Sequence, residues 1–380
     1  MQLTKYKLGD LIAQRREKNK DYDLPIRGVS REGFIKPKIE EADTSIYNVF
    51  YKNDFVFNPA RMELNSIALN LDLEKALCSS LYEVFYVKDE NVVLPEFLNL
   101  HIKRDEFARH CDYIGLGSAR EYCRFANIAE FDIKIPSIEV QREIVKADRQ
   151  IKRRIRLNEQ MIEKLEATAQ ALYRKMFIDG IDKENLPEGW RMGTLEDLGE
   201  IVGGATPSTE VAEYWSDNDI TWLSPADLSK QGVKFISKGA KDITSLGFKS
   251  CSTKMLPKNS ILFSSRAPIG LMAINTCEVC TNQGFKSLVP NGEIGYPYAF
   301  YYLLSLRDKI AEENSGSTFD EVSGKIMKEY EAIIPPKELT DEFTALATPI
   351  FKQQELKEQE NSMLSELQSL LLAKMGNLKQ

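Results

Sequence analysis

The sequence predicts an α+β protein in which two similar globular units are joined by a pair of long antiparallel coiled-coil helices, with a pseudo-two-fold internal repeat. Three observations lead to this prediction. One segment pattern occurs twice, both copies continue into heptad-spaced stretches, and both follow short strand-like runs mixed with helical ones. The expected parts are 1–139 for the first unit, 140–179 for the first helix, 186–338 for the second unit and 339–377 for the second helix.

The repeat is clearest where each globular unit gives way to its helix. Residues 135–144 read IPSIEVQREI and residues 334–343 read IPPKELTDEF, an offset of 199 positions. The same offset aligns further pairs without a gap, among them Pro136 with Pro335, Ile151 with Ile350, Leu165 with Leu364, and Leu172 with Leu371. Because chance does not keep register over some forty residues, we infer an internal duplication.

Both repeated tails have the residue spacing of coiled-coil helices. Between positions 144 and 176, eight of ten residues taken in alternating steps of four and three are apolar. In the second copy, the middle of the seam is polar at Gln354, Lys357 and Asn361. We expect the helices to pair antiparallel, since each follows a globular unit; the alternative is that each packs on its own unit. The seam supplies the candidate partner-binding residues Ile151, Ile155, Leu165, Leu172, Ile350, Leu364 and Leu371.

Length and composition fit a globular protein of two or three domains. The chain has 380 residues, of which 43% are hydrophobic and 28% charged, and no apolar run is long enough to span a membrane. The N-terminal segment has no apolar signal core, and six scattered cysteines favour reduced thiols over a disulfide scaffold. We therefore expect a cytoplasmic protein without a membrane partner.

The net charge of −7 is unevenly distributed. Residues 1–140 carry −3, residues 141–179 carry +4, residues 180–338 carry −6 and residues 339–380 carry −2. The positive block contains the run KRRIR at 152–156. Such a run on a helix is most often a solvated face, and the alternative is a stripe that binds phosphate groups.

Each unit combines short strands with a helix in a matching order. In the first unit, 45–58 and 80–87 are rich in aromatic and β-branched residues and are expected to be strands, and 94–110 is expected to be a helix. In the second unit, the expected elements are strands at 219–223, 260–265, 270–275 and 286–290 and a helix at 296–313. An arginine follows one strand closely in each unit, Arg61 in the first and Arg266 in the second.

Two similar modules on a helical spacer have a functional logic. At about 1.5 Å per residue, a spacer of nearly forty residues is roughly 50–57 Å long, which covers more than one turn of duplex DNA. Modules with divergent loops would read different half-sites. The two similar helices would offer equivalent docking surfaces to a partner.

The second unit contains a distinctive series of motifs. They are LPEGWRMGTLEDLGEIVGGATPS (186–208), EYWSDNDITWLSPADL (213–228), ILFSSRAPIGLMAI (261–274), TNQGF (281–285) and SGST (315–318). In this order and spacing, the chain resembles the specificity subunits of type I restriction-modification systems. The first unit is similar to a different target-recognition subtype through KNDFVFNPARMELNSIA (52–68) and CSSLYEVF (78–85), and it lacks the GGATP loop and the Asn-Gln-Gly turn. The resemblance covers nearly the whole chain.

This resemblance implies a function and a set of partners. The units would be two target-recognition domains that read a bipartite, asymmetric sequence in double-stranded DNA around a nonspecific spacer. The paired helices would dock two methyltransferase subunits and, through them, motor-nuclease subunits. The chain itself would be non-catalytic and bind no cofactor, because S-adenosylmethionine would belong to the methyltransferase and ATP and magnesium to the motor subunit.

Three alternatives remain open from the sequence. They are a self-contained enzyme such as a fused methyltransferase, a protein-binding coiled-coil scaffold, and the specificity subunit of a related phage-defence methylation system. Asn58-Pro59-Ala60-Arg61 only partly matches the Asn-Pro-Pro-aromatic motif of amino-methyltransferases, and no other cofactor motif supports an enzyme. Cys277 and Cys280 have the spacing of zinc ligands without a second pair, so no metal site is expected.

The residues expected to contact DNA are mainly polar or cationic and lie in loops, because base edges are read by side chains that can enter a groove. In the second unit they are Gly204, Thr206, Arg266, Asn282, Gln283, Lys286, Ser317 and Thr318. In the first unit they are Arg27, Arg31, Lys36, Lys38, Arg61 and Asn65, with Arg120 and Arg124 as secondary candidates. The alternatives are that the glycine turns are plain tight turns, that Arg266 braces the fold through a buried ion pair, and that the loop cations are solvated surface.

Overall fold

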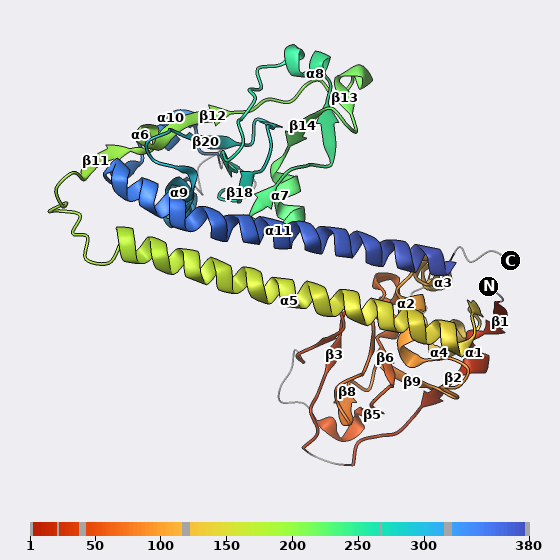
Figure 1. The fold of residues 1–380 in the computed structure, drawn as a ribbon. Helices are drawn as coiled ribbons and strands as arrows, with labels where there is room; N and C mark the ends of the chain where they lie inside the picture. Colours follow the sequence, from red (N-terminus) through yellow and green to blue (C-terminus); the bar gives the residue numbers. More distant parts are fainter. Residues whose placement is uncertain are drawn as a thin grey trace. The chain divides into compact units, whose positions relative to one another are not determined.

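The structure, a computed structural model, describes residues 3–20, 23–37, 43–115, 122–266, 268–314 and 321–376 (Figure 1). The chain divides into two compact units. Unit 1 comprises Met1–Ile155 and Met363–Gln380, and unit 2 comprises Arg156–Ser362. The division falls inside two long helices, so each unit contains part of both.

Unit 1 is built on a four-stranded antiparallel sheet in the order β2-β9-β6-β7. Its strands are β2 (Ile12–Arg15), β6 (Phe55–Phe57), β7 (Ile67–Leu69) and β9 (Glu83–Val87). Three two-stranded ladders pair β1 (Thr4–Lys7) with β10 (Asp132–Ile135), β3 (Gly28–Val29) with β4 (Phe34–Ile35), and β5 (Asn48–Tyr51) with β8 (Lys75–Cys78). The helical segments are α1 (Leu8–Leu11), α2 (Pro95–Ile102), α3 (Asp105–Gly115), α4 (Phe125–Ala129), η1 (Thr44–Ile46) and η2 (Pro59–Leu64).

Two elements expected in the first unit are each divided in the structure. The run at 45–58 forms β5 and β6, separated by a turn in which Asn53 takes a φ of 67°. The run at 94–110 forms α2 and α3, which are separated at Lys103 and Arg104. The ammonium group of Lys103 donates to the carbonyl oxygens of Arg31 and Ile67 at 2.7 and 2.9 Å, which ties the break to the sheet.

Unit 2 contains a five-stranded sheet in the order β12-β20-β17-β18-β15. Its strands are β12 (Gly199–Gly203), β15 (Phe235–Ile236), β17 (Ile261–Phe263), β18 (Met272–Asn275) and β20 (Lys286–Pro290). A second sheet, β13-β16-β14-β19, consists of β13 (Trp215–Ser216), β14 (Ile220–Leu223), β16 (Lys241–Ile243) and β19 (Cys280–Thr281), and β11 (Arg191–Thr194) pairs with β21 (Glu331–Ile334). The helical segments are α6 (Leu195–Leu198), α7 (Pro225–Gln231), α8 (Ser245–Ser250), α9 (Tyr296–Asn314), α10 (Gly324–Glu329) and η3 (Ala212–Tyr214). The four strands and the helix expected here are confirmed as β14, β17, β18, β20 and α9.

The two main sheets share one framework. The order β2-β9-β6-β7 in unit 1 corresponds to β12-β20-β17-β18 in unit 2. In both units a terminal ladder, β1·β10 or β11·β21, is followed by a four-residue helix and the first sheet strand. The duplication inferred from the helices therefore extends to the sheets, and the α+β fold with two repeated domains is confirmed.

The two long helices are α5 (Ile138–Phe177) and α11 (Lys337–Gly376), within two residues of their expected limits. Side-chain hydrogen bonds between them join Asp148 to Gln368 in unit 1, and Asn158 to Asn361 and Glu166 to Gln354 in unit 2. Partner numbers fall along α11 as they rise along α5, so the helices are antiparallel in unit 2. Two of the three polar residues in the middle of the α11 seam, Gln354 and Asn361, therefore bond to α5, whereas Lys357 donates to Glu360 on its own helix.

Each unit has its own core, and both long helices contribute to each. The core of unit 1 includes Phe55 and Phe85 from the sheet, Val145 from α5 and Met375 from α11. In unit 2, both helices contribute buried residues to the core, and they are Ala169, Tyr173, Phe177, Phe343, Ala347 and Phe351. Among the described residues, no helix is both long and apolar enough to cross a membrane.

Candidate nucleic-acid interface

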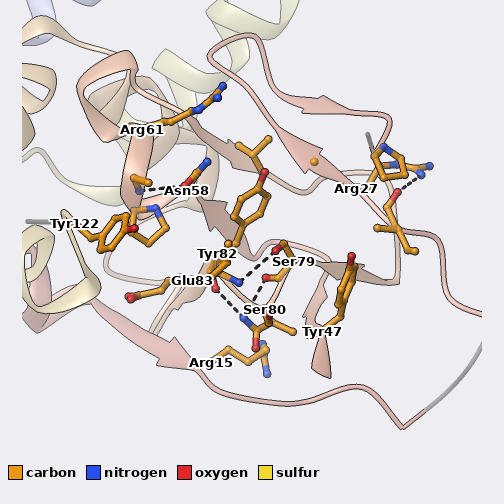
Figure 2. A pocket seen from close by; sticks show the side chains of 18 of the residues that line it. Arg15, Arg27, Tyr47, Asn58, Arg61, Ser79, Ser80, Tyr82, Glu83 and Tyr122 are labelled. Carbon is orange, nitrogen blue, oxygen red and sulfur yellow. Dashed lines mark hydrogen bonds between the residues drawn. The ribbon is translucent and has the colours of Figure 1, made fainter. Parts of the chain in front are cut away.

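Unit 1 contains a cavity of about 810 Å³ where β2 and β6 end and β9 begins (Figure 2). Its lining is strongly positive. The cationic side chains that line it are Arg15, Arg16, Lys18, Arg27, Lys36, Arg61 and Arg124, and among the residues that the structure describes the one carboxylate in its lining is that of Glu83. Such a local excess of positive charge attracts phosphate groups even in a chain whose net charge is −7.

Arg15 forms a fixed wall of this cavity. Its Nε and Nη2 atoms donate to the carboxylate of Asp54 at 2.6 and 3.0 Å, and its guanidinium lies 4.8 and 4.7 Å from the ring centres of Tyr51 and Tyr86. Burial acts to lower the pKa of Arg15, but the hydrogen bonds and charge of Asp54 outweigh it and the net shift is upward. This arginine is already paired, so it shapes the cavity more than it binds a ligand.

Three arginine and lysine residues expected to contact DNA come together in the cavity. Arg61 lies in η2, Arg27 immediately precedes β3, and Lys36 immediately follows β4. Arg61 and Lys36 are exposed, and Nη1 of Arg27 donates to the neighbouring carbonyl of Ile26 at 2.9 Å. Their charges are thus available to an anionic ligand. Arg124, a secondary candidate, also lines the cavity.

The other candidates of the first unit are placed differently. Arg31 is exposed but does not line the cavity. Asn65 lies in the interior with 7% of its surface exposed, ends η2 in the left-handed conformation, and donates to the carbonyl of Ile102 at 3.1 Å. Asn65 therefore has a structural role, and we remove it from the candidate interface. Lys38 and Arg120 lie outside the described residues.

Sequence reasoning missed Arg16 and Lys18, although the run RREK at 15–18 contains them. The cavity also includes the aromatic side chains of Tyr47, Tyr82 and Tyr122. Interleaved cations and aromatic rings are typical of surfaces that bind nucleic acid. The missed residues join the site because β2 pairs with β9, about 70 residues away in the chain.

The corresponding edge of unit 2 carries the glycine-rich loop after β12. A side chain on Gly204 would place its Cβ atom 2.1 Å from the carbonyl oxygen of Thr281 and 2.3 Å from that of Asn282. Only glycine allows this approach, which lets the amide of Ala205 donate to the Thr281 carbonyl at 2.9 Å. The loop is thereby fixed on the turn that follows β19, and the hydroxyl of Thr206 donates to Oε1 of Gln283.

The same turn positions a charged cluster. Oδ1 of Asn282 accepts from the amide of Gly284 at 2.9 Å, which closes the turn ahead of Lys286. The ammonium of Lys286 lies 3.1 Å from Oε1 of Glu321, and Nη1 of Arg266 lies 3.8 Å from Oε2 of the same carboxylate. The side chain of Arg266 is 39% exposed, so this ion pair is not a buried brace.

Unit 2 therefore gathers six of its eight candidates at one edge of the sheet, namely Gly204, Thr206, Arg266, Asn282, Gln283 and Lys286. Ser317 and Thr318 lie outside the described residues. Gln283 is exposed beside the half-buried Asn282, and such amide side chains can both donate and accept hydrogen bonds. The arrangement can recognise base edges and phosphates together.

The candidate partner-binding residues on the helices are largely occupied within the chain. Ile151 is buried, and Leu172 and Ile350 pack against the core of unit 2. The remaining four, Ile155, Leu165, Leu364 and Leu371, are half-buried. Other apolar side chains of the same helices are exposed, and they are Leu157, Met161, Leu346, Leu356, Met363, Leu367 and Leu370.

Cys277 and Cys280 bond to different parts of unit 2. The thiol of Cys277 donates to the carbonyl of Ser237 at 3.3 Å, and that of Cys280 donates to the carbonyl of Thr221 at 3.4 Å. Burial raises the pKa of both thiols, to about 12 for Cys280, so both favour the protonated form, whereas zinc binds the thiolate.

Comparisons with known proteins identify the family. A family model described as the type I restriction modification DNA specificity domain matches residues 4–167 and again residues 187–365. The MjaIX type I restriction enzyme specificity subunit of Methanocaldococcus jannaschii is 34% identical over 188 residues, 49% of this chain and 43% of that protein. The HindI specificity subunit of Haemophilus influenzae is 24% identical over 378 residues, covering 80% of this chain and 82% of that one. The match thus spans less than half the length of the archaeal relative.

A solved structure supports the same conclusion for the fold. The crystal structure of a type I restriction-modification S subunit from M. genitalium has a TM-score of 0.64 to this chain at 16% identity, with 98% of this chain and 96% of that chain covered. The two matches to the specificity-domain model show that the chain belongs to the family of type I restriction-modification specificity subunits and that it carries the DNA specificity domain twice.

Proposed function

We propose that the chain is a non-catalytic subunit that reads a bipartite target in double-stranded DNA, with one half-site bound by each unit. The observation that carries this proposal is the position of the two clusters. Each lies at the same edge of the same sheet framework, and each is built from different residues. A shared framework with different reading residues supports two readers of different sequence.

The two clusters would bind DNA by different chemistry. In unit 1, exposed cations such as Arg61 and Lys36 would neutralise phosphates and set the position of the duplex. In unit 2, the amides of Asn282 and Gln283 suit adenine, whose N6 and N7 atoms offer a donor and an acceptor, and Arg266 suits guanine. Each well-formed pair of this kind contributes about 1–3 kcal/mol of discrimination.

The long helices would dock two methyltransferase subunits, and through them the motor-nuclease subunits. The exposed leucine and methionine side chains on α5 and α11 support this role, because proteins without a binding partner rarely expose so many apolar side chains on one pair of helices. S-adenosylmethionine would then be bound by the methyltransferases, and ATP and magnesium by the motor subunits. DNA binding by the assembled complex would also draw on positive charge from these partners.

The proposal is tested by methylome sequencing of a host that expresses this chain with its neighbouring methyltransferase, against a host without the chain. The expected result is a new split motif, with two short specific blocks around a fixed gap. In the same assay, Arg61→Ala should weaken methylation, and the matched variant Arg109→Ala, at an exposed site on α3 outside both clusters and off the long helices, should not. Assembly of the complex without any new motif would refute DNA reading and favour the protein-binding scaffold.

A further inference from the structure

The first residues of two corresponding strands carry opposite charges. In unit 1, β9 begins at Glu83, which pairs with Phe57 of β6. In unit 2, β20 begins at Lys286, which pairs with Gly203 of β12. The strand registers also match. Phe55 of β6 lies opposite Phe85, two residues after Glu83, and Ile261 of β17 lies opposite Leu288, two residues after Lys286. Glu83 and Lys286 therefore occupy the same place in the two frameworks.

A second pair of segments is also equivalent. The segment 122–124 leads into α4, and the segment 321–323, at the repeat offset of 199, leads into α10. The amide of Cys123 donates to the carbonyl of Pro59 at 3.1 Å, and the amide of Val322 donates to the carbonyl of Ser265 at 3.0 Å. Both segments are thus held beside the end of the central strand, β6 or β17.

An ion pair joins the strand start to this segment in both units, with its polarity reversed. In unit 1, Nη1 of Arg124 donates to Oε1 of Glu83 at 3.1 Å. In unit 2, Nζ of Lys286 donates to Oε1 of Glu321, also at 3.1 Å. The strand supplies the carboxylate, that of Glu83, in unit 1 and the ammonium, that of Lys286, in unit 2.

In both ion pairs, the residue at the start of the strand is largely buried, and its partner in the segment before α4 or α10 is more accessible. The side chains of Glu83 and Lys286 are 12% and 16% exposed, whereas those of Arg124 and Glu321 are 60% and 36% exposed. Glu83 also accepts from Gln14 Nε2 at 3.1 Å and from the amide of Phe125 at 2.8 Å. Protein groups thus hold the enclosed residue in place. The accessible residue can still contact a ligand, although in unit 2 Oε2 of Glu321 also lies 3.8 Å from Nη1 of Arg266.

We infer that Glu83 and Lys286 are positioning residues whose charge decides which hydrogen-bonding edge each unit presents to DNA. Glu83 fixes the Arg124 guanidinium, a donor suited to an acceptor edge such as guanine O6 and N7. Lys286 fixes the Glu321 carboxylate, an acceptor suited to an amino group such as cytosine N4. The inference rests on the proposed function and assigns one base preference in each half-site to this reversed pair.

The test reverses the pair in unit 2 alone. The double variant Lys286→Glu with Glu321→Lys keeps an ion pair and inverts the accessible charge. Expressed with the methyltransferase partner, it should change one base preference in the second half-site by about tenfold or more. The first half-site and the gap should stay as in the wild type. A matched control is the swap of Lys254 with Glu200, an exposed ion pair of the same 3.1 Å length in unit 2 that lies outside the cluster.

Two further variants separate positioning from simple structural support. Lys286→Gln removes the charge and should relax the second half-site, whereas Lys286→Arg should largely restore it. An unchanged second half-site in either the reversed pair or Lys286→Gln would overturn the inference. If the reversed pair does not fold, as judged by its melting temperature, Lys286→Gln decides the question. Failure of the proposed function looks different, because the wild type would then give no split motif at all.

Discussion

Replacing Gly204 with alanine is a direct test of the unit 2 cluster. The added Cβ atom would lie 2.1 Å from the Thr281 carbonyl oxygen, while ordinary contacts of this kind are 3.4 Å or longer. The loop would have to move by more than 1 Å, because the three atoms nearest the new methyl group, at 2.1, 2.3 and 2.4 Å, all belong to the backbone. The movement would break the hydrogen bond from Ala205 to Thr281 and separate Thr206 from Gln283.

The expected cost follows from these losses. Overpacking costs about 1–3 kcal/mol and a lost backbone hydrogen bond about 1 kcal/mol, so the free energy of unfolding should fall by roughly 2–4 kcal/mol. In a unit of this size each kcal/mol corresponds to about 2–4 °C of melting temperature. Displacing one base-reading pair should also weaken binding to the second half-site by roughly 5- to 150-fold.

The assay is fluorescence polarisation of a labelled duplex bound by the assembled methyltransferase complex, together with thermal melting. Two glycines serve as controls. Gly203→Ala should be tolerated, because its nearest neighbour would lie 3.9 Å from the new Cβ atom. Gly199 lies at the opposite end of β12, where a Cβ atom would clash with the Val289 carbonyl of β20. Gly199→Ala should therefore lower the free energy of unfolding without altering base preference. Wild-type affinity of the Gly204→Ala complex for its target would refute the role given to the loop.

Three further predictions concern the interface, pH and the helix pair. Arg61→Ala should lower DNA affinity for all sequences and reduce the slope of log K against log salt by about 1, as measured by titration at several salt concentrations; an unchanged slope would count against the unit 1 cavity. His101 has a pKa lowered to about 4, first by burial and then by Arg104, so the unfolded chain binds its proton more readily between pH 6.5 and 4. Stability should therefore fall by up to about 3 kcal/mol as the pH drops through that window, and urea unfolding should show a smaller fall for His101→Gln. Lys234 donates to Glu166 at 2.7 Å and lies 3.6 Å from the ring centre of Phe351, so Lys234→Met should cost about 2–3 kcal/mol in denaturant unfolding, and adding Glu166→Gln should recover part of it.

Long periodic patterns made the helices predictable from the sequence. Heptad spacing between positions 144 and 176 and the repeat over some forty residues placed both ends of α5 and α11 within two residues, and the repeat offset indicated that both units share a framework. Short strands separated by tight turns were harder to place. The Asn53 turn divides a run of strand-forming residues, because a left-handed residue reverses the chain without interrupting the composition.

The sites were only partly predictable because they depend on strand pairing. Arg61 and Arg27 were recognisable as loop cations, but nothing local shows that Arg16 lies beside them, since that depends on the pairing of β2 with β9. Asn65 looked like a polar loop residue, yet its backbone geometry turns the side chain inward. Glu83 and Glu321 were missed because a reversed ion pair leaves no shared residue type for a sequence comparison to find.

The sharing of both helices between the two cores sets the order in which a nascent chain can fold. Unit 2 is one continuous stretch, Arg156–Ser362, and its residues leave the ribosome together. Unit 1 begins the chain, yet its core needs Met375, which is made 220 residues after Ile155. At about 5–20 residues per second, the first unit waits roughly 10–45 s for its last helix. During that interval its apolar surface is open to chaperones or to the free C-terminal helix of a neighbouring chain. A stop codon soon after Ser362 would therefore disable the first unit to be synthesised and leave the second one whole.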